Sequence, residues 1–245
     1  MKSVVWILLV VASFFPAGCD KEDGVDPSNP ADSPYVVTID PADFFPGDSI
    51  TGNLYFPLSV GKTLTYEGED EDGVPVTVEE IITDSIKTIM GVACRVVRAR
   101  EYENDVLVED TYDWYAQDRD GNVWYFGEDT HEIENGVPVN SSGSWTAGVD
   151  GALPGIIMLA EPLVGVWYRQ EYYKGEAEDV AQVLSIGETL TVQYGTFTNC
   201  LRTLEYALLE PGVEENKIYA PGIGLLRAEG TKGEGGYEDL VSITP

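Results

Sequence analysis

The sequence predicts an all-β domain, an antiparallel sandwich or barrel built from two similar β units. Short apolar and aromatic runs alternate with turn dipeptides along most of the chain, and no long window repeats with the period of a helix. The same short motifs also return in the same order in the second half of the chain. These three observations favour an antiparallel β domain over a helical one.

The turns divide the region after residue 53 into strand-sized pieces. Dipeptides typical of tight hairpin turns stand at Asp72-Gly73, Asn135-Gly136 and Asp150-Gly151. Residues 74–82 alternate apolar and polar side chains, as expected for a strand with one buried face. Only residues 175–182 could form a turn or two of helix, so strands are predicted for nearly all of this region.

The repeat indicates an internal duplication. Three pairs of motifs recur: 57–61 with 162–165, Cys94 and Glu101-Tyr102 with Cys200 and Glu205-Tyr206, and Tyr115-Ala116 with Tyr219-Ala220. We interpret residues 53–245 as one duplicated β domain with halves at about 53–130 and 160–245, joined by a Gly-rich connector at 131–159. Coincidence among hairpins is the alternative explanation.

The N-terminal segment, residues 1–18, predicts an export signal. Lys2 precedes an apolar stretch at 4–15 that is shorter than the roughly 20 residues a membrane-spanning helix needs. The end of the segment resembles the lipobox of bacterial lipoproteins: Ala17, Gly18 and Cys19 match it, whereas Pro16 stands where Leu or Val is usual. The resemblance implies acyl chains such as palmitate on Cys19 and a place in the bacterial cell envelope, on the periplasmic side or the cell surface.

An ordinary secretory signal, cut near Gly18, is the alternative to lipidation. In either case the following residues, 19–52, are rich in Asp, Pro, Ser and Gly and poor in large apolar side chains. Such a composition predicts a disordered acidic linker, which the lipid would tie to a membrane.

Cys94 and Cys200 remain once Cys19 is assigned to the lipid. Both lie in apolar, strand-like runs at matching places of the repeat, and an oxidising compartment would allow one disulfide between them. Two buried thiols that never meet are the alternative. With one histidine and no CxxC motif, the chain gives no support to a zinc site.

The charge of the chain restricts its partners. Asp and Glu number 43 against 14 Lys and Arg, a formal net charge of −29. The phosphates of a nucleic acid would repel such a chain, and so would anionic lipid headgroups. Cationic molecules, divalent metal ions or simple solubility are what the charge favours.

Four longer strings carry a resemblance to a known group of proteins. Residues 113–129, 143–158, 168–179 and 210–225 are similar to strings shared by a family of uncharacterised secreted bacterial proteins and lipoproteins. The resemblance covers most of the chain from Tyr55 to the C-terminus. It implies one exported domain and brings no activity, ligand or catalytic residue with it.

Acidic and aromatic side chains concentrate at residues 109–129, which makes this segment the best candidate for a ligand site. Since side chains alternate along a strand, Asp113 and Tyr115 share one face and Trp114 lies on the other. Aromatic faces beside carboxylates suit sugars or organic cations. The predicted ligand-binding residues are Asp113, Trp114, Tyr115, Trp124, Trp145, Arg169 and Glu171. A hairpin with core aromatics and solvated acids would explain the same pattern.

Asp118, Asp120 and Asn122 place oxygen donors at alternate positions around Gly121, as calcium loops do. A tight turn between two strands is the alternative explanation. Calcium is the only cofactor for which the sequence offers a motif.

The functional hypothesis is therefore a lipid-anchored binding or envelope-structural protein without catalysis of its own, with a glycan or a small cation as ligand. One alternative is a carboxylate-dependent polysaccharide hydrolase or lyase, in which Asp113 and Glu171 would act as acid and base. The other is a calcium-stabilised adhesion or assembly module. No GxSxG nucleophile motif occurs in the chain.

Overall fold

The computed structural model describes residues 34–46, 50 and 52–245. The predicted signal at 1–18, Cys19 and much of the predicted linker lie outside the described residues. Within the described part, no helix is long and apolar enough to span a bilayer.

The described chain consists almost entirely of antiparallel strands, with one short 3-10 helix, η2 (Pro41–Asp43). The first strands are β1 (Thr63–Asp70), β2 (Pro75–Ile89), β3 (Val92–Glu103), β4 (Val106–Gln117), β5 (Val123–Glu134), β6 (Val137–Asn140), β7 (Trp145–Thr146) and β8 (Leu153–Met158). The later strands are β9 (Trp167–Arg169), β10 (Glu171–Tyr172), β11 (Asp179–Val192), β12 (Gly195–Ala207), β13 (Glu214–Ala220), β14 (Gly224–Lys232) and β15 (Gly236–Thr244).

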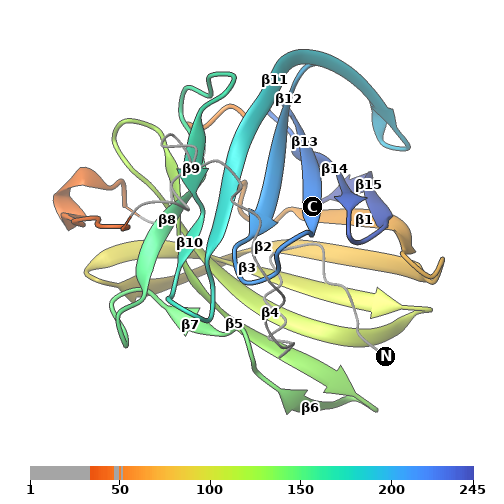
Figure 1. Cartoon of the computed structure of the whole chain (residues 1–245), viewed down its shortest axis with the longest axis horizontal. Helices are drawn as coiled ribbons and strands as arrows, with labels where there is room; N and C mark the ends of the chain where they lie inside the picture. Colours follow the sequence, from red (N-terminus) through yellow and green to blue (C-terminus); the bar gives the residue numbers. More distant parts are fainter. Residues whose placement is uncertain (1–33, 47–49, 51) are drawn as a thin grey trace, which may run out of the picture.

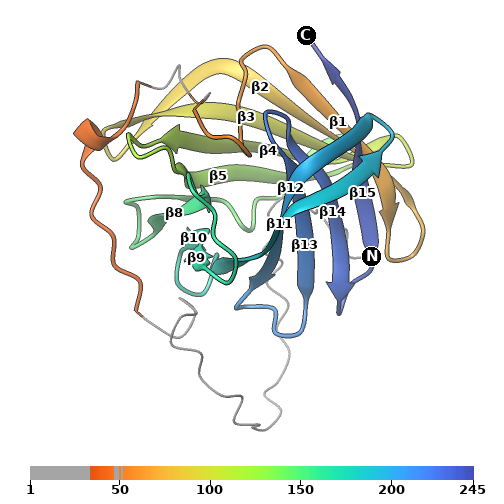
Figure 2. The same cartoon turned by 90° about the horizontal axis from the view of Figure 1, so that it is seen from above.

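The strands form one sheet that curls back on itself. Its order is β10-β8-β5-β4-β3-β2-β1-β15-β14-β13-β12-β11-β9, and every printed pair along this path is antiparallel. The two ends of the path, β9 and β10, are consecutive in the chain and separated only by Gln170. The sheet therefore closes nearly completely, as a flattened barrel with two strongly crossed halves (Figures 1 and 2). The predicted all-β antiparallel sandwich or barrel is confirmed.

Two similar groups of strands meet in this barrel. β1–β5 with β8 make one group, and β9/β10 with β11–β15 make the other; β15 pairs with β1, and β10 pairs with β8. Gly61 and Gly165, which precede the first strand of each group, have φ of +82° and +86°. Their N–H groups donate to the carbonyl oxygens of Ile82 and Val183, both at 2.8 Å. The second group thus repeats the pairing of the first, from the same PLxVG-like motif.

The two cysteines occupy matching strands without meeting. Cys94 lies on β3 and Cys200 on β12, and both are fully buried and free. β3 and β12 are separated in the sheet by several strands. The disulfide that the sequence left open is not formed in the structure.

Apolar side chains fill one end of the barrel. Leu58, Leu64, Ile82, Leu225 and Tyr219 are buried there. They line a cavity of about 50 Å³ in which Glu80 and Lys217 are the charged side chains. A space of that size holds a few water molecules and no drug-sized ligand.

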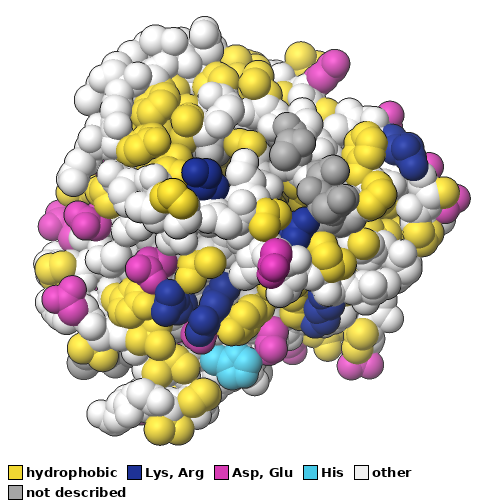
Figure 3. Space-filling view, turned by 180° about the vertical axis from the view of Figure 1, so that it is seen from behind, with side chains coloured by type: hydrophobic (Ala, Val, Ile, Leu, Met, Phe, Trp, Pro, Cys, Tyr) yellow, Lys and Arg dark blue, Asp and Glu magenta, His cyan; other side chains and the backbone are white. Residues whose placement is uncertain are grey.

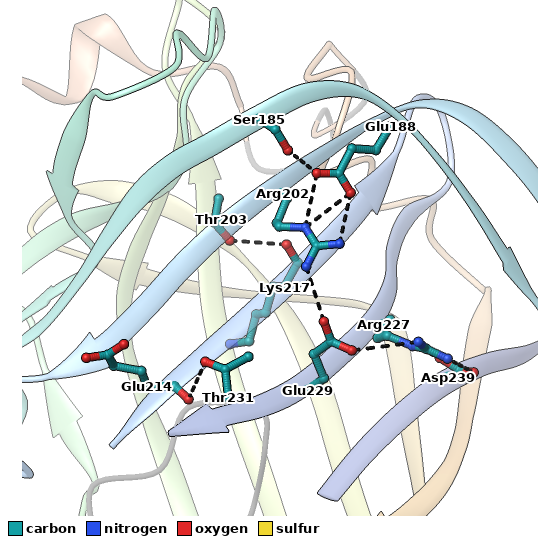
Figure 4. A network of polar contacts seen from close by, with 10 residues as sticks. All are labelled: Ser185, Glu188, Arg202, Thr203, Glu214, Lys217, Arg227, Glu229, Thr231 and Asp239. Carbon is teal, nitrogen blue, oxygen red and sulfur yellow. Dashed lines mark hydrogen bonds and ion pairs between the residues drawn. The ribbon is translucent and has the colours of Figure 1, made fainter. Parts of the chain in front are cut away.

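Ion pairs run across the outer face of the second group of strands (Figure 4). Arg202 lies 2.9 Å from Glu188 and 3.2 Å from Glu229. Arg227 in turn lies 2.6 Å from Asp239, which extends the row from β11 to β15. Because all these side chains are partly exposed, each pair contributes at most about 1 kcal/mol.

The opposite face carries a similar mixture of charges. Figure 3 shows Lys and Arg side chains beside Asp and Glu there, with the single histidine next to them. Arg98 lies 2.6 Å from Asp110 on this side of the first group of strands, and Arg100 lies 3.0 Å from Glu79. Across the described part of the chain, seven Lys and Arg side chains form ion pairs with Asp or Glu.

Residues 34–46, which we name the strap, correct the predicted domain boundary. The strap belongs to the folded domain, although its composition predicted a disordered linker. Phe44 is buried and packs edge-on against Trp124 and Phe126, with ring centroids 6.1 and 5.6 Å away. The Tyr35 hydroxyl donates to the Pro154 carbonyl oxygen at 2.8 Å. Two aromatic anchors suffice to order a segment that is otherwise polar.

Candidate functional site

A cleft of about 360 Å³ opens near the ends of β4, β5 and β7. This volume lies within the usual range for small-molecule sites, roughly 300–1,000 Å³. Aromatic, acidic and hydroxyl side chains line it: Lys87, Trp114, Glu128, Asp129, Ser144, Trp145, Thr146, Val149, Asp150 and Tyr173. A second hollow of about 330 Å³ lies among the loop residues 206–208 and 211–214 and has Tyr206 as its aromatic side chain.

A glycine brings the walls of the cleft together. Gly127 on β5 has φ of +115°, and a Cβ on it would lie 2.2 Å from the carbonyl oxygen of Trp145. Only glycine allows β7 to approach β5 this closely. On β4, the register shifts between Asp113 and Tyr115, so the sheet bends beside the cleft. Local backbone chemistry thus sets the position of Trp114, Glu128 and Trp145.

Lys87 places a cation on the aromatic wall. Its ammonium group lies 3.1 Å from the centre of the Trp114 ring, within the range of a cation–π interaction. Burial lowers the pKa of Lys87, while Asp129 acts in the opposite direction. The Lys87 ammonium group thus covers one face of the Trp114 ring.

Glu128 forms the inner wall of the cleft and is only 3% exposed. Burial raises its pKa well above the usual value, and Glu171 and Asp113 raise it further because their charges repel that of Glu128. The carboxyl is thus protonated at pH values where an ordinary glutamate is ionised. A protonated carboxyl both donates and accepts hydrogen bonds.

Trp145 offers an unused donor at the same place. Its indole Nε1 is buried and makes no hydrogen bond of normal geometry, although Glu171 lies near enough for the indole to stabilise that carboxylate. The ring packs edge-on against Tyr125 at 5.5 Å between centroids. The rigid packing fixes the direction of the N–H group.

Behind the cleft, acidic side chains from both groups of strands converge inside the barrel. We call them the interior acids: Glu80, Glu101, Glu109, Asp113, Glu128, Glu171, Asp179, Glu205, Glu215 and Glu238. Burial is the largest cause of the raised pKa of Asp113 and Asp179, each to about 7, and of Glu215 and Glu238, each to about 8.

One lysine faces the interior acids. The ammonium group of Lys217 lies 3.0 Å from Glu205 and 3.4 Å from Glu215. Both carboxylate oxygens of Glu101 and of Glu238 are buried and have no hydrogen-bond partner among the described residues. The interior acids thus outnumber the cations near them, and burial without compensating charge raises the pKa of most of these carboxyls.

The structure separates the predicted ligand-binding residues into three places. Trp114 and Trp145 line the cleft. Asp113, Tyr115 and Glu171 lie inside the barrel, where the Tyr125 hydroxyl donates to Asp113 at 2.7 Å and the Tyr115 ring stacks on Tyr125 at 5.0 Å. The shared face predicted for Asp113 and Tyr115 is thus the inner face of the barrel.

Trp124 and Arg169 lie away from the cleft and bind the strap. The Trp124 indole N–H donates to Asp118 at 2.7 Å, and its ring meets Phe44. The Arg169 guanidinium lies 5.5 and 5.0 Å from the ring centres of Tyr35 and Tyr172. Both residues stabilise the fold where the sequence predicted ligand contacts.

Asp113 is close enough to Glu171 for its charge to raise the pKa of the Glu171 carboxyl. Each residue, however, is 1% exposed. Unlike Glu128, neither of them lines the cleft, so a polysaccharide bound there would not reach these two carboxyls. The arrangement therefore gives no support to the hydrolase alternative at these two residues.

Asp118 and Asn122 form a closed hydrogen-bonded turn. The two carboxylate oxygens of Asp118 accept from the backbone N–H and the side-chain amide of Asn122 and from the Trp124 indole, at 2.7–2.9 Å. Asp120 at the tip is exposed. Over the described ranges, no group of three or more His, Cys, Asp or Glu side chains is arranged to hold a metal ion.

Sequence reasoning missed several residues of the cleft: Lys87, Ser144, Thr146, Val149, Asp150 and Tyr173. They come from β2, from the loops around β7 and from the end of β10, and they meet only because the barrel closes. Lys217 carried a usable signal, since a lone lysine precedes Tyr219-Ala220 where Asp113 precedes Tyr115-Ala116 in the first repeat.

Comparisons with known proteins match the chain to two solved structures at low sequence identity. A solved structure from Bacteroides fragilis NCTC 9343, provisionally assigned as an exported protein with a YmcC-like fold, is 16% identical with a TM-score of 0.48; the match covers 79% of this chain and 100% of that one. A provisionally assigned lipoprotein from Parabacteroides distasonis ATCC 8503 is 13% identical with a TM-score of 0.35, over 78% and 99% of the chains. No family model and no curated protein matches the chain.

Proposed function

We propose that this chain is an extracytoplasmic binding protein whose cleft beside Trp114 and Trp145 takes a saccharide unit. The observation that carries the proposal is the lining of the cleft. Two tryptophans stand beside a protonated Glu128, the exposed side chains of Asp129 and Asp150 and the hydroxyl of Thr146. Aromatic faces and groups that donate and accept hydrogen bonds are what a ring of hydroxyl groups requires.

The charges of the cleft narrow the choice of ligand. Asp129 and Asp150 at the rim are exposed carboxylates, and Lys87 is the one basic side chain in the lining of this cleft. Anionic ligands would be repelled by these carboxylates and by the net charge of −29. A purely apolar ligand would leave the polar lining without partners, at a cost of about 1–3 kcal/mol for each buried group. A neutral or positively charged saccharide meets neither obstacle.

The extracytoplasmic location is supported by the N-terminal residues. The apolar segment at 4–15 and the Ala17-Gly18-Cys19 sequence support export with a lipid on Cys19. Membrane fractionation of cells that produce the wild type and Cys19→Ser tests the anchor. Wild type in the membrane fraction and the variant in the soluble fraction is the expected result, and equal distribution of the two would contradict lipidation.

Calorimetric titration with neutral and basic monosaccharides and short oligosaccharides tests the binding function. Asp129→Asn and Asp150→Asn should weaken binding at least about tenfold, since a hydrogen bond to a charged group contributes about 1.5–3 kcal/mol. Glu214→Gln, in the second hollow of about 330 Å³, is the matched control and should leave affinity unchanged. Absence of heat with every sugar would reject the proposal.

A further inference from the structure

We infer that the cleft selects a saccharide carrying a positively charged amine, and that this amine binds in exchange for the proton on Glu128. The inference rests on the proposed function and deepens it. Three geometric features carry it: the place of Glu128 in the cleft wall, the acids packed behind it, and the small number of cations near it.

Glu128 connects the cleft with the interior of the barrel. It is 3% exposed and still lines the cleft. In the β4–β5 ladder it stands directly opposite Asp113, and in the β5–β7 ladder directly opposite Trp145. A negative charge on Glu128 therefore interacts electrostatically both with a ligand in the cleft and with the interior acids.

Acidic groups act on Glu128 from nearly every neighbouring element. Inside the barrel these are Asp113 and Glu109 on β4, Glu171 on β10 and Asp179 on β11. The lining of the cleft also contains Asp129 next to it, Asp150 in the loop after β7 and the phenol of Tyr173. The ionised form of Glu128 thus lacks compensation on both sides.

Cations are scarce around Glu128. Lys87 lines the same cleft, but its ammonium group lies over the Trp114 ring at 3.1 Å from the ring centre. Lys217 is engaged with Glu205 and Glu215 at 3.0 and 3.4 Å. A ligand ammonium at the inner wall would supply the charge that Glu128 lacks.

The exchange balances in charge and protons. The O–H bond of the Glu128 carboxyl breaks, its proton goes to the solvent, and the carboxylate forms an ion pair with the ligand ammonium. The rim carboxylates of Asp129 and Asp150 remain available for the hydroxyls of the ring. The net charge of the buried wall is unchanged, so the ammonium group is buried as one partner of an ion pair and not as an isolated charge.

D-Glucosamine and D-glucose are the matched probes, because they differ in one amine. Titrations of the full-length protein at about pH 5.5, where a primary amine stays protonated, are run in two buffers of different ionisation enthalpy. We expect glucosamine to bind at least about tenfold more tightly than glucose, which corresponds to about 1.4 kcal/mol, and to release up to one proton per site. Glu128→Gln should abolish the proton release, whereas Glu214→Gln should preserve it.

The possible failures are distinguishable. Equal affinity for the two sugars, or glucosamine binding without proton release, would overturn the amine-for-proton exchange and leave saccharide binding standing. Binding of neither sugar, nor of any other in the panel, would reject the proposed function itself. If Glu128→Gln does not fold, the wild type decides: glucosamine affinity must rise between about pH 5 and about pH 7 as the carboxyl becomes easier to ionise, and a flat profile contradicts the inference.

Discussion

The ammonium group of Lys217 and the carboxylate of Glu205 lie 3.0 Å apart inside the barrel, with neither residue more than 6% exposed. Burial lowers the pKa of Lys217, but Glu205 and Glu215 raise it by more, so the lysine stays charged. This pair brings a positive charge to an interior that is otherwise acidic.

Replacement of that lysine is expected to be severe. Lys217→Met leaves Glu205 and Glu215 buried without their cation, and loss of one partner of a buried pair costs about 3–5 kcal/mol. The free energy of unfolding, measured in urea, reports the loss. Lys232→Met is the control, since Lys232 pairs with Glu214 at the surface; its effect should stay below about 1 kcal/mol.

Stability should fall as the pH rises, the reverse of the usual behaviour near neutrality. Burial raises the pKa of Glu80 and Asp113 to about 7 and of Glu215 and Glu238 to about 8. The folded state therefore holds protons that the unfolded chain loses near pH 4, and the stability they provide is lost as the pH passes through 7 and 8.

Each proton held in excess by the folded state changes stability by about 1.4 kcal/mol per pH unit, or about 3 °C in Tm for a chain of this size. Thermal unfolding followed by circular dichroism between about pH 5 and about pH 8 is the measurement. We expect Tm to decline over that interval. A Tm that rises with pH would show that the interior acids are ionised in the folded state.

The strap should contribute to stability through Phe44. Phe44→Ala removes a buried ring that contacts Trp124 and Phe126, and we expect a loss of about 3 kcal/mol. Phe45→Ala is the matched control, because Phe45 is 36% exposed. Hydrogen exchange of the amide of Phe45, which donates to the Gln117 carbonyl at 3.0 Å, should accelerate in Phe44→Ala. Equal stability of the two variants would mean that the strap is not held by this ring.

Substitution of Asp118 tests whether calcium binds at this turn and stabilises the fold. Because both carboxylate oxygens already accept hydrogen bonds, Asp118→Ala should cost about 1–3 kcal/mol for the donors left unpaired, and equally so with calcium or with chelator. Thermal unfolding under both conditions measures this. A wild-type Tm that increases with millimolar calcium, and an increase that Asp118→Ala with Asp120→Ala abolishes, would restore the calcium-stabilised alternative.

The two thiols should be unreactive in the folded protein. Burial raises the pKa of Cys94 to about 12 and also raises that of Cys200, and the thiolate is the reactive form. A thiol reagent such as DTNB should label neither residue in buffer and both after denaturation. Failure to label either residue after denaturation without reductant would indicate a disulfide that the fold does not show.

The sequence predicted the strands well and the inside of the barrel poorly, for a physical reason. Turn dipeptides and β-branched runs act locally, so Asn135-Gly136 already indicates the hairpin of β5 and β6. Alternation correctly put Asp113 and Tyr115 on one face. It did not say which face is inside, because this barrel buries acids and aromatics together and hydropathy then fails to separate interior from exterior.

Only some of the residues that line the cleft could be predicted from the sequence. Trp114 and Trp145 attract attention because tryptophan beside acids is an unusual surface composition. Lys87 and Asp150 gave no local signal, and they reach the cleft through the curl of β2 and through the close approach of β7 to Gly127. Contacts of that kind depend on closure of the sheet, which a single sequence does not encode in any short window.

The strap also sets how far the domain can stand from a membrane. Residue 34 adjoins Tyr35, which is held on the barrel. If Cys19 carries a lipid, the chain from Cys19 to residue 34 would therefore reach at most about 50 Å, less than half of the roughly 115 Å available up to residue 53. The chain would join the domain beside Pro154 on β8, where Tyr35 is held by its hydrogen bond. A lipidated molecule would therefore be confined to a thin layer above the bilayer. Its cleft would then encounter ligands displayed on that surface before ligands in free solution.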